Sequence, residues 1–314
     1  MLLALTLLGC SDKGDPDLQR EEPPFVPVVT FSEETLVLTG GYADPSVAPF
    51  EERYTLYASL TEAAEGADIG TLAFSSEDLV TWTPDPNGMI FLGVATGRAL
   101  QMDDGVRFFY PSTGPVADGT VPTTSGGISI YSAWSNDSVH FVDDPGLRTT
   151  SDEGDVGGPT LIELDDGTWR AFYHVASGKA ADGEIPSASI WAADSDNGLD
   201  WDLEEEPVLE ASKDVEGVDP TAQLLHPFVT PGPDAEGTPE AGYWMFYNSH
   251  DIMYAAYSDD AADWDRLGPI GLEAADFDAI AIGPNQWRVW YGRYAEDTRG
   301  EIYTAIMNIS ISNE

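Results

Sequence analysis

Cysteine and positive charge are what this sequence has least of. The 314 residues include one cysteine, Cys10, so no disulfide can form within the chain. Lysine and arginine together number 13 against 56 aspartates and glutamates, which gives a formal net charge of −43. A surface of that charge repels phosphate backbones and anionic lipid headgroups, so the composition argues against nucleic acid as a partner.

Long hydrophobic runs are also missing. The apolar segment Leu2–Leu8 is far shorter than the roughly 20 residues that cross a bilayer. It leads into Leu7-Leu8-Gly9-Cys10, which resembles the lipobox of bacterial lipoproteins. That resemblance implies a signal peptide at residues 1–9, acyl chains on Cys10 and, from Ser11, export to the outer membrane. The alternative is an apolar N-terminus with a free thiol.

Residues 10–24 are polar and lack apolar periodicity, so we expect a flexible tether that reaches the membrane only through its lipid. The acidic residues of the rest of the chain are spread over turns and loops. They are interpreted either as a solvated coat or, for some of them, as ligands of a divalent cation such as Ca²⁺.

A short strand motif occurs five times. In each copy a large apolar residue precedes a tyrosine, and a further strand leads into it. Two of the preceding hairpins contain Asp-Gly, at Asp104-Gly105 and Asp166-Gly167, the preferred sequence of a two-residue turn. The five copies are Leu56-Tyr57, Phe109-Tyr110, Phe172-Tyr173, Phe246-Tyr247 and Trp290-Tyr291.

A second motif follows four of these five strands. A strand ends in serine, and an aromatic residue that starts another strand lies six positions later. The intervening Asp, Asn, Glu and Gly residues are typical of turns whose side chains bond their own backbone. The four copies, whose serines lie 59, 60 and 63 residues apart, are Ser76–Trp82, Ser135–Phe141, Ser195–Trp201 and Ser258–Trp264.

Five units of about 60 residues, each with four antiparallel strands, predict an all-β, five-bladed β-propeller, because radial stacking buries both faces of every sheet. We expect this domain to span residues 25–314 and to be a monomer. The last unit ends after its third strand at 301–309. Residues 25–31 or 35–38 are therefore predicted to supply the fourth strand and close the ring.

In a propeller, the residues that start each innermost strand line the axial pocket. Two long loops, 112–126 and 176–187, are expected on the same face. Carboxylates that meet at an axis need protonation, a cation or a base such as Arg98. The predicted axial residues are Asp44-Pro45, Arg98, Asp155 to Pro159, Asp219-Pro220, and Asp276 or Asp278.

Gly41-Tyr42-Ala43-Asp44-Pro45-Ser46-Val47 resembles the first-blade motif of the five-bladed glycoside hydrolases of family 43 and related furanosidases. Ser75–Trp82 and Asp194–Trp201 are similar to a corner of the same propellers. The resemblance implies that Asp44 is a general base that activates water. It also implies an acid in blade two and a glutamate in blade three.

The chain departs from that pattern at two of the three positions. The blade-two stretch around Arg98 contains no acid, and the blade-three position is Gly157, two residues before Pro159. Asp155 and Asp219 are the remaining candidates for a general acid, while Arg98, Asp276 and Asp278 are candidate substrate-binding residues. The four histidines lack metal-ligand spacing and are interpreted as structural.

Three functions remain open from the sequence. The favoured one is a cell-surface lipoprotein that binds carbohydrate in an acidic axial pocket and has diverged from catalysis. The second is an active glycosidase with Asp44 as base. The third is a structural or adhesive surface protein whose axial carboxylates hold Ca²⁺. A fold of this kind hosts many functions and does not choose among them.

Overall fold

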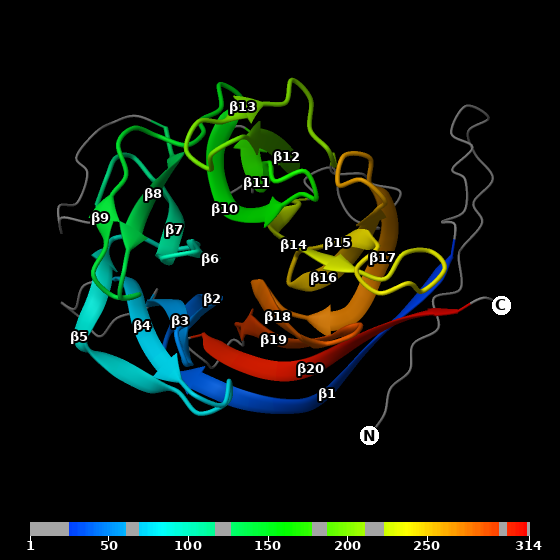
Figure 1. Ribbon diagram of the computed structural model, residues 1–314, viewed down its shortest axis with the longest axis horizontal. Coiled ribbons are helices and arrows are strands. Elements are labelled where there is room, and N and C mark those ends of the chain that lie inside the picture. The colour runs from blue at the N-terminus through cyan, green and yellow to red at the C-terminus, as the bar shows by residue number, and fades with distance from the viewer. Residues whose placement is uncertain are drawn as a thin grey trace.

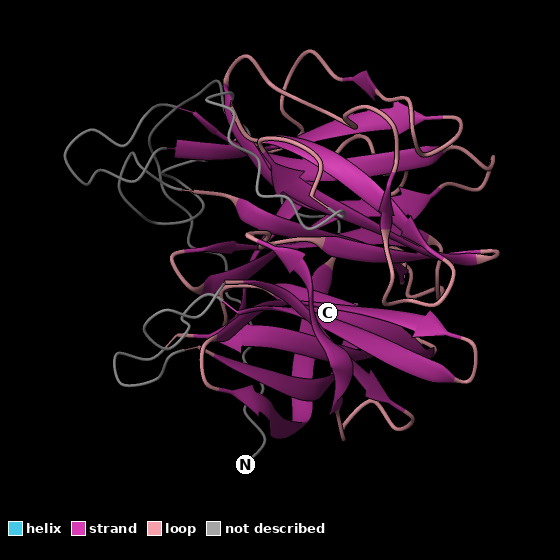
Figure 2. Ribbon diagram, turned by 90° about the vertical axis from the view of Figure 1, so that its left-hand side faces the viewer, coloured by secondary structure: helices cyan, strands magenta, loops and turns pink. Residues whose placement is uncertain are grey.

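The protein is an all-β ring of five sheets, seen along its axis in Figure 1. The computed structural model describes residues 25–60, 69–116, 127–177, 187–210, 223–294 and 300–312. Each sheet has four strands, and every pairing within a sheet is antiparallel. Figure 2 shows the described residues as strands and loops, and none of them forms a helix that could span a membrane. The predicted five-bladed β-propeller is confirmed.

Each sheet is one blade, in which the first-named strand is innermost and the last-named is outermost. Blade I contains β2 (Tyr42–Phe50), β3 (Arg53–Leu60), β4 (Gly70–Ser76) and β5 (Thr83–Leu92). Blade II contains β6 (Arg98–Met102), β7 (Gly105–Ser112), β8 (Ser129–Ser135) and β9 (Val142–Asp143). Blade III contains β10 (Gly154–Glu163), β11 (Trp169–Ser177), β12 (Ser187–Ser195) and β13 (Asp202–Leu203). Blade IV contains β14 (Leu225–Gly232), β15 (Gly242–Ser249), β16 (Ile252–Ser258) and β17 (Asp265–Glu273). Blade V contains β18 (Phe277–Gly283), β19 (Gln286–Arg293), β20 (Glu301–Ser312) and β1 (Val26–Thr39).

Blade V joins the two ends of the domain. Its outermost strand, β1, pairs with β20 from Val26 opposite Ser312 to Thr39 opposite Glu301, with two irregularities in register. The long β1 and β20 lie side by side along the lower edge of the ring in Figure 1. Both segments that the sequence offered for closure therefore belong to one strand, and the ring leaves no open blade between its first and last sheets.

The serine corners form because each one satisfies its own backbone. In blade I, the Ser76 hydroxyl accepts hydrogen bonds from the backbone N–H of Asp78 and Leu79, at 3.2 and 2.9 Å. The Asp78 carboxylate then accepts from Val80 and Thr81, at 2.9 and 2.7 Å. Blades II, III and IV repeat this pattern with Asp137, Asn197 and Asp260 in the second position. The repeat read from sequence is thus a repeated turn chemistry.

Both Asp-Gly hairpins exist; the first is a two-residue turn, although not through Asp-Gly itself, and the second has a longer loop. Met102 pairs with Gly105, so Asp103 and Asp104 form the first turn and Gly105 starts β7. A Cβ on Gly105 would lie 2.2 Å from the carbonyl oxygen of Ser135, so close packing against β8 requires glycine there. The second hairpin is longer, since Glu163 pairs with Trp169, and Gly167 adopts a φ of 85°.

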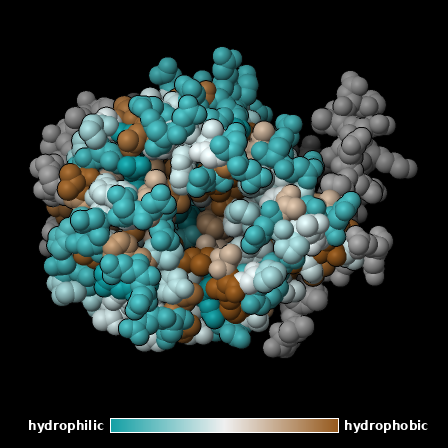
Figure 3. Space-filling view, viewed as in Figure 1, coloured by the Kyte–Doolittle hydropathy of each residue, from teal (hydrophilic) through white to brown (hydrophobic). Residues whose placement is uncertain are grey.

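Aromatic side chains fill the space between blades, as the sequence indicated. Tyr57 of blade I contacts Phe108 of blade II at a ring-centroid distance of 5.2 Å. Trp82 of blade I meets Trp290 of blade V edge-on at 6.1 Å. The outer surface is different: the face in Figure 3 is largely hydrophilic and is hollowed near its centre, where the innermost strands surround the axis. Packing between blades thus holds five inner strands around one axis.

The corner carboxylates predict an acid-dependent stability. Backbone hydrogen bonds, from Thr81 to Asp78 and from Ala262 to Asp260, lower the pKa of both carboxyl groups. A depressed pKa stabilises the fold above the unfolded value of about 3.9, and this contribution disappears as the pH falls through the folded value. We expect Asp78→Asn/Asp260→Asn to be less stable than the wild type near neutral pH, with the gap narrowing below about pH 4.

Urea denaturation of both proteins across that pH range measures this gap. Asn197 already occupies the equivalent position of blade III, so the corner accepts an amide without rearrangement. A gap that stays constant with pH would show that the carboxylate charge contributes nothing.

Candidate functional site

Three of the innermost strands enter the axis through the same kind of backbone irregularity. Asp44-Pro45, Gly158-Pro159 and His226-Pro227 each lie at a register shift between the first two strands of a blade. The residue before each proline has a positive φ, of 49°, 53° and 50° respectively. A left-handed conformation costs a non-glycine residue roughly 1–2 kcal/mol, and bulges of this kind re-aim side chains near functional sites. The bulges thus direct Asp44 and His226 toward the axis.

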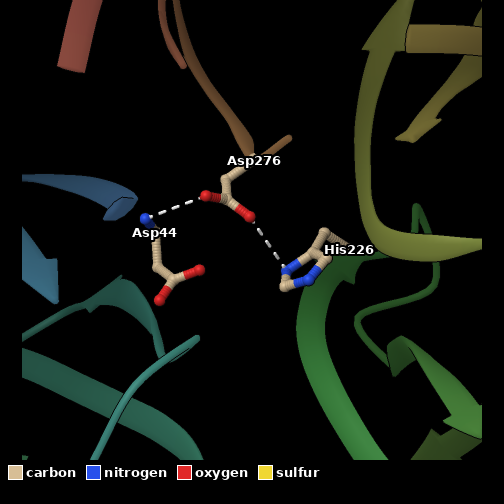
Figure 4. Close-up of side chains that lie close together, drawn as sticks. All are labelled: Asp44, His226 and Asp276. Atoms are coloured by element: carbon tan, nitrogen blue, oxygen red, sulfur yellow. Dashed lines mark hydrogen bonds and ion pairs between the residues drawn. The ribbon is translucent and has the colours of Figure 1, made fainter. Parts of the chain in front are cut away.

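Each blade contributes one residue where its innermost strand reaches the axis, within the strand in blades I, III and IV and just before it in blades II and V. They are Asp44, Thr96, Gly158, His226 and Asp276. Three of these, shown in Figure 4, form a compact cluster that we call the axial cluster: Asp44, His226 and Asp276. One potential ligand atom from each of the three lies within 4.8 Å of the other two.

Hydrogen bonds fix the two carboxylates of the axial cluster. Asp276 Oδ2 accepts from the backbone N–H of Asp44 at 3.1 Å, and Asp276 Oδ1 lies 3.4 Å from His226 Nδ1 (Figure 4). Asp44 Oδ2 accepts from the backbone N–H of Thr96 at 3.0 Å. Asp276 also accepts from the hydroxyl of Tyr294 at 3.2 Å. Residues of blades I, II, IV and V therefore position this cluster together.

Burial dominates the electrostatics of the cluster. Burial, reinforced by the charge of Asp276, raises the pKa of Asp44 to about 7, although His226 opposes the shift. Burial also raises the pKa of Asp276. The same desolvation lowers the pKa of His226, against the attraction of Asp44. The site is therefore one where charged forms are costly and a proton or cation is readily taken up.

A buried ion pair lies beside the cluster. Arg98 Nη1 is 2.5 Å from Asp278 Oδ1, and Arg98 Nη2 donates to the carbonyl of Phe277 at 3.0 Å. Asp278 in turn accepts from the backbone N–H of Val47 at 2.5 Å. Arg98 is thus the base that was expected among the axial acids, and the acid that it pairs with is Asp278.

The blade-three wall of the site is filled by a histidine. Gly157 pairs with His174 across β10 and β11, and a Cβ on Gly157 would lie 2.6 Å from His174 Nε2. Burial and the neighbouring His226 hold the pKa of His174 well below its usual value, so its ring is neutral near pH 7. The position where the resembled family has a glutamate is therefore occupied by an imidazole from the next strand.

The cavity enclosed by these residues is small. It has a volume of about 20 Å³ and is lined by Asp44, Pro45, Thr96, Gly97, Arg98, Gly158, Pro159, His226, Asp276 and Phe277. A water molecule needs about 10–15 Å³ by this measure, so the space fits one water or one ion. Tyr294, bonded to Asp276, keeps 47% of its surface exposed.

Of the predicted site residues that the structure describes, four lie together at the axis and one, Asp155, lies apart. The structure brings together Asp44, Arg98, Asp276 and Asp278. Asp155 is exposed and accepts a hydrogen bond from the backbone N–H of Ile128 at 3.1 Å, and it does not line the cavity. Its catalytic role stays a prediction.

Blade IV differs from the sequence expectation. Its innermost strand begins at Leu225, so His226-Pro227 takes the position that was expected for Asp219-Pro220. Asp219, Cys10 and most of the two long loops lie outside the described residues. His226 and Tyr294 were missed. A signal for His226 was present, because His-Pro directly precedes an apolar strand just as Asp44-Pro45 does.

Comparison with known proteins supports the fold. No protein-family model matches the chain, and no curated protein matches it. Among solved structures, a thermostable family-43 glycoside hydrolase is 19% identical, with a TM-score of 0.64 over 90% of this chain and 92% of that one.

Two further solved structures show a comparable likeness. The GH43_1 enzyme from Xanthomonas citri complexed with xylotriose is 15% identical, with a TM-score of 0.59 over 90% and 93% of the two chains. A family 117 glycoside hydrolase from Zobellia galactanivorans is 14% identical, with a TM-score of 0.58 over 89% and 90%. At such identities the likeness establishes the fold: this chain is a five-bladed β-propeller like those of glycoside hydrolases.

The contact between Gly157 and His174 predicts a non-additive pair of substitutions. Gly157→Ala forces a methyl group against the imidazole, and we expect the free energy of unfolding to fall by about 1–3 kcal/mol. In a His174→Ala background the same change is expected to cost much less, because the ring is gone. Urea denaturation of the four proteins in this double-mutant cycle measures the coupling. Strictly additive effects would rule out the contact.

Proposed function

We propose that this protein binds carbohydrate at the axial face of the propeller and does not hydrolyse it by the two-carboxylate mechanism of the enzymes that it resembles in fold. The binding site consists of the axial cluster and Tyr294. Cys10 anchors the domain to the bacterial outer membrane through its lipid, and the domain acts there as a monomer.

The observation that carries this proposal is the arrangement of Tyr294. Its hydroxyl donates to Asp276 at 3.2 Å, while 47% of the residue stays exposed. The ring is therefore held at its hydroxyl end, and we infer that its accessible part offers an apolar surface to a ligand. A sugar ring has an apolar C–H face and polar edges, so it can lie on such a ring while a hydroxyl reaches the buried carboxylates.

The spacing of the carboxylates argues against hydrolysis. Inverting glycosidases need two carboxyl groups roughly 6.5–9.5 Å apart, with room for a water molecule between base and substrate. The carboxylates that line the cavity are Asp44 and Asp276, and their candidate oxygens lie within 4.8 Å of each other. Asp276 is also engaged by Asp44 N–H and by Tyr294. The pair cannot flank a glycosidic bond in that way.

The blade-three wall supports the same interpretation. His174 occupies the space that a side chain at position 157 would need. Because burial lowers the pKa of His174, its ring is neutral near pH 7, and a neutral imidazole is too weak an acid to protonate a leaving group. Restoring a glutamate at this position would require removing the imidazole first.

Tyr294 gives a direct test of binding. We expect Tyr294→Ala to weaken the affinity for the best glycan of an array by about tenfold, which corresponds to the loss of about 1.4 kcal/mol from one aromatic contact. Tyr294→Phe keeps the ring and loses only the hydroxyl, so it is the matched control and should retain most of the affinity. Equal affinity of wild type and Tyr294→Ala would place the glycan elsewhere.

Substitution of Asp44 distinguishes carbohydrate binding from catalysis. We expect the wild type to show no turnover on a panel of aryl furanosides and pyranosides, and Asp44→Asn to weaken glycan binding through loss of an anionic acceptor. The two measurements are colorimetric release of the aryl group and isothermal titration with the glycan. Turnover by the wild type that Asp44→Asn abolishes would overturn the binding-only proposal.

A further inference from the structure

The axial cluster contains two carboxylates and no residue with a permanent positive charge. Asp44 and Asp276 are both carboxylates, and Asp276 is only 5% exposed. Among the described residues that line the cavity, Arg98 is the one with a permanent positive charge, and it is committed to Asp278 at 2.5 Å. Buried carboxylates without a counter-charge are costly, so this arrangement calls for an added positive charge.

One contact within the cluster, between His226 and Asp276, is longer than an ordinary hydrogen bond. His226 Nδ1 and Asp276 Oδ1 are 3.4 Å apart, beyond the usual 2.7–3.2 Å of an N–H···O bond. Two ligands of a tetrahedral ion held at about 2.0–2.1 Å are separated by about 3.3 Å. The distance between these two atoms therefore matches one edge of a coordination shell.

The remaining contacts leave ligating atoms available. Asp44 uses Oδ2 to accept from Thr96, and Asp276 uses Oδ2 to accept from Asp44 N–H and Tyr294. These bonds orient both carboxylates, as the outer contacts of metal ligands generally do. The cavity of about 20 Å³ that the three side chains share is large enough for one ion.

From this geometry we propose that Asp44, His226 and Asp276 hold a divalent transition-metal ion on the propeller axis. An imidazole nitrogen with two carboxylate oxygens suits ions such as Zn²⁺ or Mn²⁺, whereas Ca²⁺ and Mg²⁺ prefer shells made of oxygen alone. Three protein ligands leave at least one coordination position open. This metal site shares its residues with the proposed glycan site, but its three ligands come from the chain itself, so metal binding can be measured without a glycan.

Equilibrium dialysis of the chelator-treated protein against Zn²⁺, followed by elemental analysis, tests the proposal. High salt is needed to screen the diffuse attraction of cations to a surface of net charge −43. We expect one Zn²⁺ per chain and a melting temperature about 5 °C higher at a hundredfold excess over Kd. His226→Ala and Asp276→Asn should each abolish the stoichiometric binding.

His140→Ala is the matched control, because His140 has a 70% exposed side chain in the corner of blade II and should leave binding intact. If the site variants fail to fold, the visible spectrum of the Co²⁺-loaded wild type serves instead, and bands of a four-coordinate nitrogen–oxygen site that Zn²⁺ removes would support the proposal. Three results would overturn it: no stoichiometric Zn²⁺, Zn²⁺ binding that survives His226→Ala in a folded protein, or binding of Ca²⁺ alone.

Discussion

The pairing of β1 with β20 is the constraint on which the rest of the structure depends. It makes the two ends of the domain parts of one sheet, so blade V is complete and lies against blade I. That junction is then secured by polar contacts: Asp276 accepts from Asp44 N–H, and Asp278 accepts from Val47 N–H. The candidate site is therefore a product of ring closure, because the two carboxylates of the axial cluster come from opposite sides of this junction.

The axis combines several features that are individually unfavourable. Asp44 and His226 adopt positive φ values of 49° and 50°, and both carboxylates of the axial cluster have a raised pKa. Packing between blades offsets the cost of this strained backbone and buried charge. Aromatic contacts such as Tyr57–Phe108 and Trp82–Trp290 contribute to that packing around the ring. Strained backbone and buried charge concentrated at one place, within an otherwise regular fold, are typical of a functional site.

The architecture was largely predictable because its signals are local. The serine corners satisfy their own backbone within six residues, and they recur regardless of what the blade contacts. Ring closure was also predictable, since a blade with three strands requires a fourth. The same locality placed Asp44, Arg98, Asp276 and Asp278 at the axis.

The chemistry of the site was less predictable because it depends on register and on contacts between blades. The Asp219-Pro220 pair imitated the motif of blade I, and only the start of β14 at Leu225 shows that His226 occupies the position. Tyr294 is distant from Asp44 in sequence and reaches the site through Asp276. The sequence could not show whether Arg98 pairs with Asp276 or with Asp278. The direction of each carboxylate depends on where β18 begins, and in the structure Arg98 contacts Asp278.

On the proposed function, the convergence of the five innermost strands creates one binding site at the axis. The most direct measurement is a crystal structure of the protein with the glycan that binds it best. We predict a sugar ring on the face of Tyr294, with a hydroxyl directed toward Asp44. A glycan bound on the outer edges of the blades, with the axial residues free of contact, would contradict it.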